Sequence, residues 1–388
     1  MRFLTAGLCW LLVLIICICA WFRASKPSIH TPHTPALESS FLDSKPQSAP
    51  PPPPRLSLVM AGDALLHKAL YLDAKIKDSE NAYDFSRMVA PLAAIVAKRD
   101  LAFYNQESML GGVALRLGSY PMFNSPQEFG DSMIAIGFNL ISLANNHAMD
   151  RKSAGIEASL QYWRPKEEAL GLIASGTYAS LGERDNPKIL EKNGLTYALL
   201  AYTYGTNGIP LPKGREYLVA VYDTGMLKRD LASLRPKVDL LIVSMHWGVE
   251  YSFKPTEEQR QIARLLASLG ADIIIGHHPH VIQPIEFIDG SLVVYSLGNL
   301  LSGQVGLDRK VGMLVGLEAV KEPGQTRLKL ENIAVELVYT YHDKSKQNFK
   351  TIPFSKLDDS ILPNAIEIQN SYLSKVGIDK LDFVKVGL

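Results

Sequence analysis

The feature that most constrains the fold is a regular alternation of short apolar runs with amphipathic segments, from about residue 56 to residue 311. The amphipathic segments carry helix-start signals: Thr256 with Gln259 predicts a capping box, and Ser125 before Pro126 predicts a capped helix. Strands that alternate with helices in this way are typical of an α/β layered fold. The expected strands cover residues 56–61, 101–104, 140–144, 196–202, 240–245, 273–275 and 292–295.

Polar side chains follow these apolar runs, at the point where each strand ends. In layered α/β folds the loops at the carboxyl ends of the strands build the functional site. Carboxylate, amide and imidazole groups suit Mn, Fe or Zn, often as a pair of ions that clamps a phosphate-like group. The clusters are Gly62-Asp63, Asn105-Gln106-Glu107, Asn145-Asn146-His147, His246-Trp247-Gly248-Val249-Glu250, His278-Pro279-His280 and Ser296-Leu297-Gly298-Asn299.

The distribution of the histidines supports one common site. Taken singly, each cluster is compatible with an ordinary turn or with a buried histidine. Of the nine histidines, however, only His30, His33 and His342 lie outside residues 67–280. In His278-Pro279-His280 an extended backbone would point both imidazoles the same way. We therefore expect the clusters to meet in a single metal site.

The order and spacing of these motifs resemble the bacterial capsule-synthesis protein family CapA, the poly-γ-glutamate capsule biosynthesis proteins. The family is related to the calcineurin-like metallophosphoesterases, which implies a four-layer α/β/β/α sandwich with a two-metal site at the strand ends. The resemblance covers roughly residues 56 to 305 and rests on Gly62-Asp63, Asn105-x-Glu107, Asn145-Asn146-His147-x-x-Asp150, His246-Trp247-Gly248-x-Glu250-Tyr251, His278-Pro279-His280-Val281-x-Gln283-Pro284-x-Glu286 and Tyr295-Ser296-Leu297-Gly298-Asn299.

The resemblance implies a role for most of these residues. His147 would protonate a leaving oxygen, and Asp150, from the same motif, joins it as the second catalytic residue. Glu107 would bridge two divalent ions, which would be Mn, Fe or Zn. The complete set of ion ligands would be Asp63, Glu107, Asn146, His246, His278 and His280. The substrate-binding residues would be Trp247, Glu250, Tyr251 and Asn299, although packing and turn formation account equally well for Trp247, Tyr251 and Asn299.

His67 is a further candidate ligand, reached by a different argument. Metallophosphoesterases begin with Asp-x-His, whereas here Ala64 and Leu65 follow Asp63. If a helix starts directly after Gly62-Asp63, then Asp63 and His67 share one face of it at i, i+4. The alternative is that His67 is a surface residue at a helix start, which leaves one ion short of a ligand.

The N-terminus predicts a membrane anchor. Phe3 to Phe22 carries no charged residue, and a helix of that length spans about 30 Å, the thickness of a bilayer core. The length of the run favours a retained anchor over a cleaved signal peptide. We expect a single-pass anchor in the cell membrane (1–23), a Pro-rich disordered linker (24–55), an extracytoplasmic CapA-like domain (56–311) and a β-rich C-terminal extension with a tail (312–388).

Composition narrows the classes of function. The net charge of +1 argues against a nucleic-acid partner, which requires a basic excess. All three cysteines lie in the first 19 residues, so the body of the protein has no thiol ligand.

Three hypotheses of function remain. One hypothesis is a metal-dependent hydrolase acting on a phosphoester or on a bond in an envelope polymer. Another is a non-catalytic factor that holds or exports an anionic capsule polymer beside membrane-embedded synthesis proteins. A purely structural spacer, the third hypothesis, has no need of the polar clusters.

Overall fold

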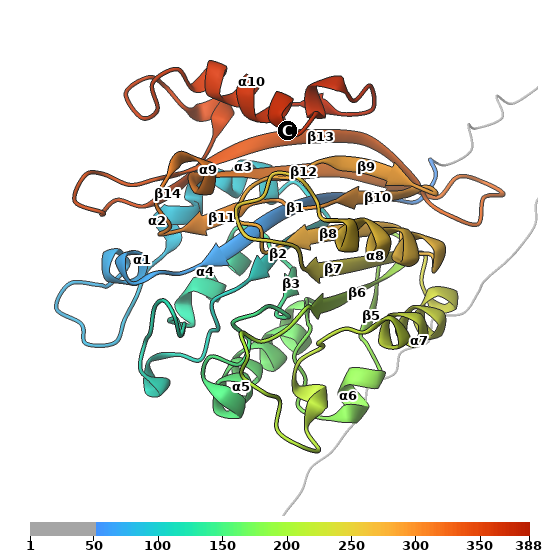
Figure 1. Cartoon of the computed structure of the whole chain (residues 1–388), viewed down its shortest axis with the longest axis horizontal. Coiled ribbons are helices and arrows are strands. Elements are labelled where there is room, and N and C mark those ends of the chain that lie inside the picture. Colours follow the sequence, from blue (N-terminus) through green and yellow to red (C-terminus); the bar gives the residue numbers. More distant parts are fainter. Residues whose placement is uncertain (1–51) are drawn as a thin grey trace, which may run out of the picture. The chain divides into compact units, whose positions relative to one another are not determined.

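The computed structural model describes residues 52–388. The predicted anchor, residues 1–23, and all but the last residues of the predicted linker lie outside the described residues. Within residues 52–388, no helix combines the length and the apolar character needed to cross a bilayer. This part of the chain is a mixed α/β fold with two sheets (Figure 1).

The first sheet has nine strands, and strands from both ends of the described chain contribute to it. Its strands are β1 (Arg55–Leu65), β2 (Leu101–Gln106), β3 (Leu140–Ser142), β4 (Ile173–Ser175), β11 (Asn299–Ser302), β12 (Val311–Val320), β13 (Lys329–Tyr341), β14 (Lys350–Pro353) and β15 (Lys385–Val386). β1 pairs in parallel with β2 and β11 and antiparallel with β12. The strands after residue 311 therefore extend the sheet that β1 begins.

The second sheet has six strands, and its central four are parallel. Its strands are β5 (Ile189–Lys192), β6 (Leu195–Thr203), β7 (Leu240–His246), β8 (Ile273–His277), β9 (Ile285–Ile288) and β10 (Ser291–Val294). The antiparallel strands β5 and β9 lie at its two edges. Because β6, β7, β8 and β10 run the same way, their carboxyl ends and the loops that follow them lie at one end of the sheet.

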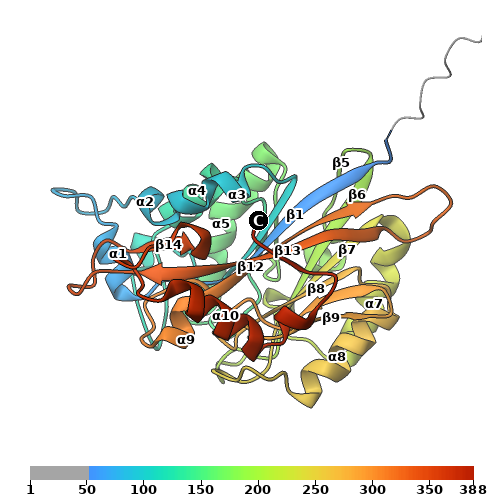
Figure 2. The ribbon, with the colours of Figure 1, turned by 90° about the horizontal axis from the view of Figure 1, so that it is seen from above.

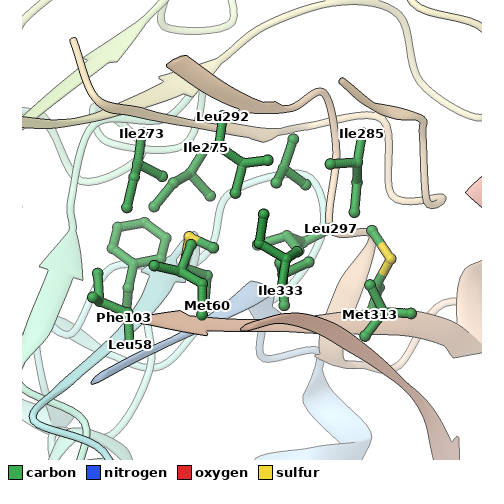
Figure 3. Packing of buried hydrophobic residues seen from close by; sticks show 14 of the residues in the cluster. Leu58, Met60, Phe103, Ile273, Ile275, Ile285, Leu292, Leu297, Met313 and Ile333 are labelled. Carbon is green, nitrogen blue, oxygen red and sulfur yellow. The ribbon is translucent and has the colours of Figure 1, made fainter. Parts of the chain in front are cut away.

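The two sheets pack face to face over an apolar layer, which Figure 3 shows from close by. Leu58, Met60 and Phe103 of the first sheet meet Ile273 and Ile275 of the second, and each is at most 1% exposed. Successive side chains of a strand point to opposite faces, so the residues between them on β1 and β2 face away from the second sheet. Because successive side chains alternate between the two faces of the sheet, β1 and β2 present apolar residues on both faces.

Helices cover the outer face of each sheet. Helices α1 to α4 pack on the outer face of the first sheet, and α7 and α8 pack on that of the second. Figure 2 shows the two sets on opposite sides of the sheets. The helices are α1 (Lys68–Asp73), α2 (Ser86–Val89), α3 (Ala93–Val96), α4 (Glu128–Ala135), α5 (Lys152–Leu170), α6 (Leu181–Asp185), α7 (Thr224–Leu234), α8 (Glu257–Ser268), α9 (Leu307–Lys310) and α10 (Ala365–Lys375).

Two predicted helix starts have different outcomes. The capping box at Thr256 is confirmed, since its side chain and that of Gln259 each bond the other's backbone amide at the start of α8. The cap predicted at Ser125 is wrong, because α4 begins only at Glu128. Ser125 is buried and its hydroxyl bonds that of Ser108, so a tertiary contact replaces the local cap.

A helix in the C-terminal region, which carries only a weak sequence pattern, lies along the first sheet. Helix α10 packs on the face of β12 and β13 that also borders the second sheet, with Tyr372 and Leu373 buried there (Figures 1 and 2). Its buried residues are few and its polar ones many, so it depends on this packing rather than on an isolated helical preference.

β1 does not end where the sequence predicts. It continues through Gly62 and Asp63 to Leu65, and Asp63 pairs with Asn105 on one side and Asn299 on the other. A helix directly after Asp63, the condition for pairing Asp63 with His67 at i, i+4, is therefore absent, and α1 starts only at Lys68 with His67 at its N-cap position. The two neighbouring strands satisfy the backbone of β1 here, which outweighs the turn preference of Gly-Asp.

Candidate metal centre

Asp63 is fixed at the end of β1 by contacts on both of its oxygens. Its Oδ1 accepts a hydrogen bond from the Asn105 amide at 2.8 Å, and its Oδ2 accepts one from the backbone amide of His278 at 3.2 Å. The Nδ1 atom of His277 lies 3.2 Å from Oδ1, and that of His280 lies 3.4 Å from Oδ2. The carboxylate therefore joins the end of the first sheet to the loop that follows β8.

Glu107 has the opposite character, because it is fully buried and both of its carboxylate oxygens lack a hydrogen-bond partner among residues 52–388. It follows β2 directly, and its backbone amide is held by the carbonyl of Ala64 at 3.1 Å. The Nε2 atoms of His246 and His280 each lie 3.7 Å from its Oε1. A buried carboxylate without partners is costly unless a cation completes its coordination.

Three histidines of the second sheet face these carboxylates. His246 is the last residue of β7, and His278 and His280 follow β8. The extended backbone predicted for His278-Pro279-His280 is wrong: the segment bends, with φ of 95° at His278 and 56° at His280. Positive φ is uncommon outside glycine, although histidine adopts it more readily than most residues, and such residues cluster at functional sites where the surroundings hold them.

The imidazoles of this centre have distinct protonation states. Burial lowers the pKa of His278 to about 4 and holds that of His246 well below its usual range, so both rings are neutral near pH 7. Burial opposes a charge on His280 as well, but Glu107 and Asp63 outweigh it and raise the pKa of His280 to about 9. Neutral imidazoles are the form that ligates a metal ion.

The two carboxylates also differ. Burial disfavours a charged Asp63, yet the neighbouring imidazoles of His277 and His280 outweigh it and hold the pKa of Asp63 well below its usual range. Burial raises the pKa of Glu107 well above its usual range, and the attraction of His280 offsets this only in part. Glu107 is thus the member of the centre that most needs a cation to carry its charge.

The donor atoms gather into groups that share members. Each group holds its ligand atoms within 4.8 Å of one another, and the groups are Asp63, Glu107 and His280; Glu107, His246 and His278; and Glu250, His278 and His280. Glu107 belongs to the first two, and His278 and His280 meet in the third. Oxygen and imidazole donors at this spacing are compatible with divalent cations.

The motif after β3 lies beside this centre. Asn146 Oδ1 lies 3.0 Å from His246 Nε2, which places the amide oxygen next to the second group. His147 Nδ1 lies 2.8 Å from Asp150 Oδ2, and both residues are buried. Asp150 Oδ2 also accepts a hydrogen bond from the backbone amide of Phe123, so the carboxylate fixes the imidazole against the loop before α4.

His67 does not join the carboxylate and histidine groups. It occupies the N-cap position of α1 without a side-chain capping hydrogen bond, and its Nδ1 lies 3.2 Å from the backbone nitrogen of Gly303. Its ring packs edge-on against Phe123 with centroids 5.1 Å apart, and the Phe123 ring also packs edge-on against that of His147 at 4.7 Å. Because β1 remains extended beyond Asp63, the i, i+4 relationship that would have aimed His67 at the centre is missing.

The four predicted substrate-binding residues divide into two pairs. Trp247 is 1% exposed and its indole donates to the carbonyl of Tyr295, so its contacts are those of a core residue. Asn299 is fully buried, and its Oδ1 lies 3.0 Å from His280 Nδ1. Glu250 and Tyr251 are exposed, and the Tyr251 ring lies 6.2 Å from that of His280. Only the second pair borders the solvent side of the centre.

Three residues of this region carry contacts that sequence reasoning did not assign. His277 lies beside Asp63, and the run of three histidines around Pro279 is the signal that could have indicated it. The Tyr204 ring lies 4.9 Å from that of His278. The amide of Asn207 contacts both Asn146 and His147. Tyr204 and Asn207 lie on a loop after β6. Its polar and glycine residues are equally typical of an ordinary turn and of a loop that closes over a substrate.

Comparison with known protein families matches the part of the chain that holds the candidate metal centre. Residues 57–304 match the family described as bacterial capsule synthesis protein PGA_cap. This match spans more than half of the chain and includes every candidate ligand. The chain belongs to this capsule synthesis family. The PGA_cap segment ends within the loop after β11, so β12 to β15 and α10 lie beyond it.

Two relatives of this PGA_cap chain come from Bacillus. It is 32% identical over 176 residues to the PGA biosynthesis protein CapA of Bacillus subtilis (strain 168), which covers 44% of each chain. It is also 32% identical over 172 residues to the capsule biosynthesis protein CapA of Bacillus anthracis, covering 43% of this chain and 41% of that one. The matched part is less than half the length of either relative.

Among solved structures, the chain is similar to the 5'-nucleotidase of Candida albicans SC5314. The sequence identity is 12% and the TM-score is 0.43, with 84% of this chain and 59% of that chain covered.

Proposed function

We propose that this chain is a membrane-anchored, extracytoplasmic protein of poly-γ-glutamate capsule biosynthesis, with a two-ion, phosphoesterase-like hydrolase site. The observation that carries the metal site is Glu107, whose buried oxygens both lack a hydrogen-bond partner within the described chain, while four further donors, from Asp63, His246, His278 and His280, share its groups. Membership of the capsule synthesis family supports the biological setting. The charge-free run of residues 3–22 supports the anchor.

Two overlapping sets of donors support two ions. Asp63 and His280 would hold one ion, and His246, His278 and the amide oxygen of Asn146 the other. Glu107 is common to both sets and would bridge them. Such ions supply Lewis acidity at a phosphoryl or carbonyl oxygen and lower the pKa of water. The order of helices, sheet, sheet and helices is the basis for proposing the four-layer fold of calcineurin-like metallophosphoesterases.

His147 and Asp150 are the pair placed to move a proton. Asp150 accepts at His147 Nδ1, which leaves Nε2 as the atom that would give a proton to a leaving oxygen. The edge of Phe123 against the imidazole keeps the ring in one orientation. Neither residue belongs to the ligand groups, so their part in turnover is separable from ion binding.

Elemental analysis of the purified full chain tests this proposal. We expect about two equivalents of Mn, Fe or Zn in the wild-type protein and a loss of at least one in Glu107→Gln. Glu336→Gln is the matched control, because Glu336 is a buried glutamate on β13 whose oxygen accepts from Ser355 at 2.8 Å, outside the centre. A folded wild-type protein that takes up no ion would refute the proposal.

A second function is a non-catalytic assembly factor that holds or exports the capsule polymer. The position of His67 outside the ligand groups favours it, because one ion would then lack the ligand that metallophosphoesterases place after the first aspartate. Ions in such a protein would bind polymer carboxylates rather than activate water. Turnover of a chromogenic phosphodiester by the metal-loaded protein separates the two functions.

A further inference from the structure

A row of three side chains leads from the centre to the surface. The ring of Tyr251 lies 6.2 Å from that of His280, at an interplanar angle of 34°. The guanidinium carbon of Arg309, on α9, lies 4.8 Å from the centroid of the same tyrosine ring. Tyr251 is 46% exposed, so the row passes from a buried histidine to solvent. Arg309 therefore lies within about 11 Å of the His280 ring, as the sum of the two distances.

Arg309 has no carboxylate partner among residues 52–388. Its one side-chain hydrogen bond, from Nε, goes to the carbonyl of Val305 at 2.5 Å, which leaves its terminal amino groups free. The neighbouring Asp308 does not neutralise it, because the hydroxyl of Tyr372 and the ammonium of Lys375, both on α10, take up that carboxylate. Within the described part of the chain, the positive charge beside the centre thus has no carboxylate partner.

The segment that carries Arg309 is tied to the centre. The Asn299 amide donates to the carbonyl oxygen of Arg309 at 2.9 Å, while Asn299 Oδ1 lies 3.0 Å from His280 Nδ1. Tyr251 is held from the other side, since its backbone amide donates to the carbonyl oxygen of Pro279 at 2.7 Å. Tyr251 adopts a φ of 65°, which is uncommon for a bulky residue and persists only where the surroundings hold it.

We propose that Arg309, held on the ring of Tyr251, binds a second anionic group of the substrate while a first group occupies the metal centre. The inference rests on the proposed function and extends it to the class of substrate, a polyanion whose charged groups repeat at a spacing of about 11 Å or less. A guanidinium keeps its charge at every accessible pH and matches carboxylate or phosphate with two parallel donors. Polymers bearing carboxylates and polymers bearing phosphodiesters share this chemistry.

Binding measurements on the metal-loaded full chain in detergent test the proposal. The probes are an oligomer of γ-linked glutamate, an oligomer of glycerol phosphate, and phenyl phosphate, which carries one anionic group. We expect Arg309→Gln to bind at least one of the two oligomers about tenfold more weakly and phenyl phosphate with unchanged affinity. The oligomer that loses affinity identifies the anion. Added salt weakens the wild-type interaction more than that of the variant.

Control variants distinguish the effect of the Arg309 side chain on binding from general effects of charge and from loss of ions. Arg309→Lys keeps the charge but loses the planar fork, and it restores part of the lost affinity. Arg55→Gln removes one positive charge at the far end of β1, about 26 Å from Asp63 along the strand, and leaves binding unchanged. Equal oligomer affinity in wild type and Arg309→Gln, or an equal loss for phenyl phosphate, overturns the proposal. Absence of ions from the wild-type protein would instead refute the proposed function. Elemental analysis measures the ion content separately from oligomer binding.

Discussion

A Cβ atom on Gly62 would lie 1.9 Å from the carbonyl oxygen of Gly298, so only glycine fits at this point of β1. The same carbonyl accepts a hydrogen bond from the backbone amide of Asp63 at 2.9 Å. The close approach of two glycine-bearing segments therefore sets the position of the first ligand. A contact between backbones, rather than between side chains, controls the geometry of this end of the centre.

Gly62→Ala is expected to lower the free energy of unfolding by about 1–3 kcal/mol, the usual cost of overpacking. The added methyl group has to push β1 away from Gly298, which also displaces Asp63. Chemical denaturation measures the effect, and metal content measures the displacement. Gly182→Ala is the control, since a Cβ there meets only the Ser180 hydroxyl at 3.8 Å. A Gly62→Ala protein as stable as the control would contradict this account.

Glu107→Gln is expected to act in opposite directions on the metal-free and metal-loaded protein. Without ions, the substitution removes a buried carboxylate that has no hydrogen-bond partner among residues 52–388, so the melting temperature stays equal or rises. With ions, the wild-type protein gains stability from binding and the variant does not. Thermal unfolding with and without a chelator measures both effects, with Glu336→Gln as the control. The prediction fails if Mn or Zn raises the melting temperature of both variants equally.

His147→Ala is expected to lower turnover by about 10²–10⁴-fold with unchanged ion content, because a proton donor is lost and no ligand is. Asp150→Asn keeps an acceptor for the Phe123 amide but loses the charge that orients His147, and we expect a loss of about 10–100-fold. Rates with a chromogenic phosphodiester and elemental analysis measure the two quantities. His342→Ala, which removes a histidine packed on Phe349, is the control. Loss of ions from His147→Ala would make it a ligand instead.

His67→Asn is expected to leave ion stoichiometry unchanged and to alter the pH dependence of stability. Burial lowers the pKa of His67 from 6.5 to about 4 in the folded protein. Between these values only the unfolded chain binds the proton, so stability is greatest above pH 6.5 and falls as the pH drops toward 4. One histidine contributes a slope of at most about 1.4 kcal/mol per pH unit. Urea denaturation of the metal-free protein from pH 7 to 4 checks whether the variant loses this slope; an identical profile in both proteins speaks against it.

Local sequence patterns predicted the elements that depend on local physics. The capping box at Thr256 uses two side chains within one turn, and it is present as predicted. Most strands in the parallel region were also predictable, because a buried parallel strand is a nearly continuous apolar run. The polar clusters at strand ends predicted that Asp63 and Glu107 lie at one end of the first sheet and His246, His278 and His280 at one end of the second, since parallel strands bring their carboxyl ends to the same edge of a sheet. That the two ends meet follows from the packing of the sheets.

Contacts between distant segments were not predictable. β1 continues past Gly62 because β2 and β11 both pair with it, and β11 is encoded more than 200 residues later. The turn at His278 depends on the Asp63 carboxylate, which accepts a hydrogen bond from the backbone amide of His278. Helix α10 carries a weak apolar pattern and owes its position to the face of β12 and β13. In each case the partner that decides the conformation is absent from the local sequence.

The pairing of Asp63 with His278 after β8 joins residues 215 positions apart, and Glu107, Asn146 and His246 come from between them. Both sheets must have assembled before any complete set of donors exists, and closing so long a loop is among the late and entropically costly steps of folding. A partly folded chain therefore offers an ion only scattered single donors. With the extracytoplasmic location proposed above, the ion would be selected only after the chain has folded outside the membrane, and the metal supply of that compartment would decide which element the centre carries.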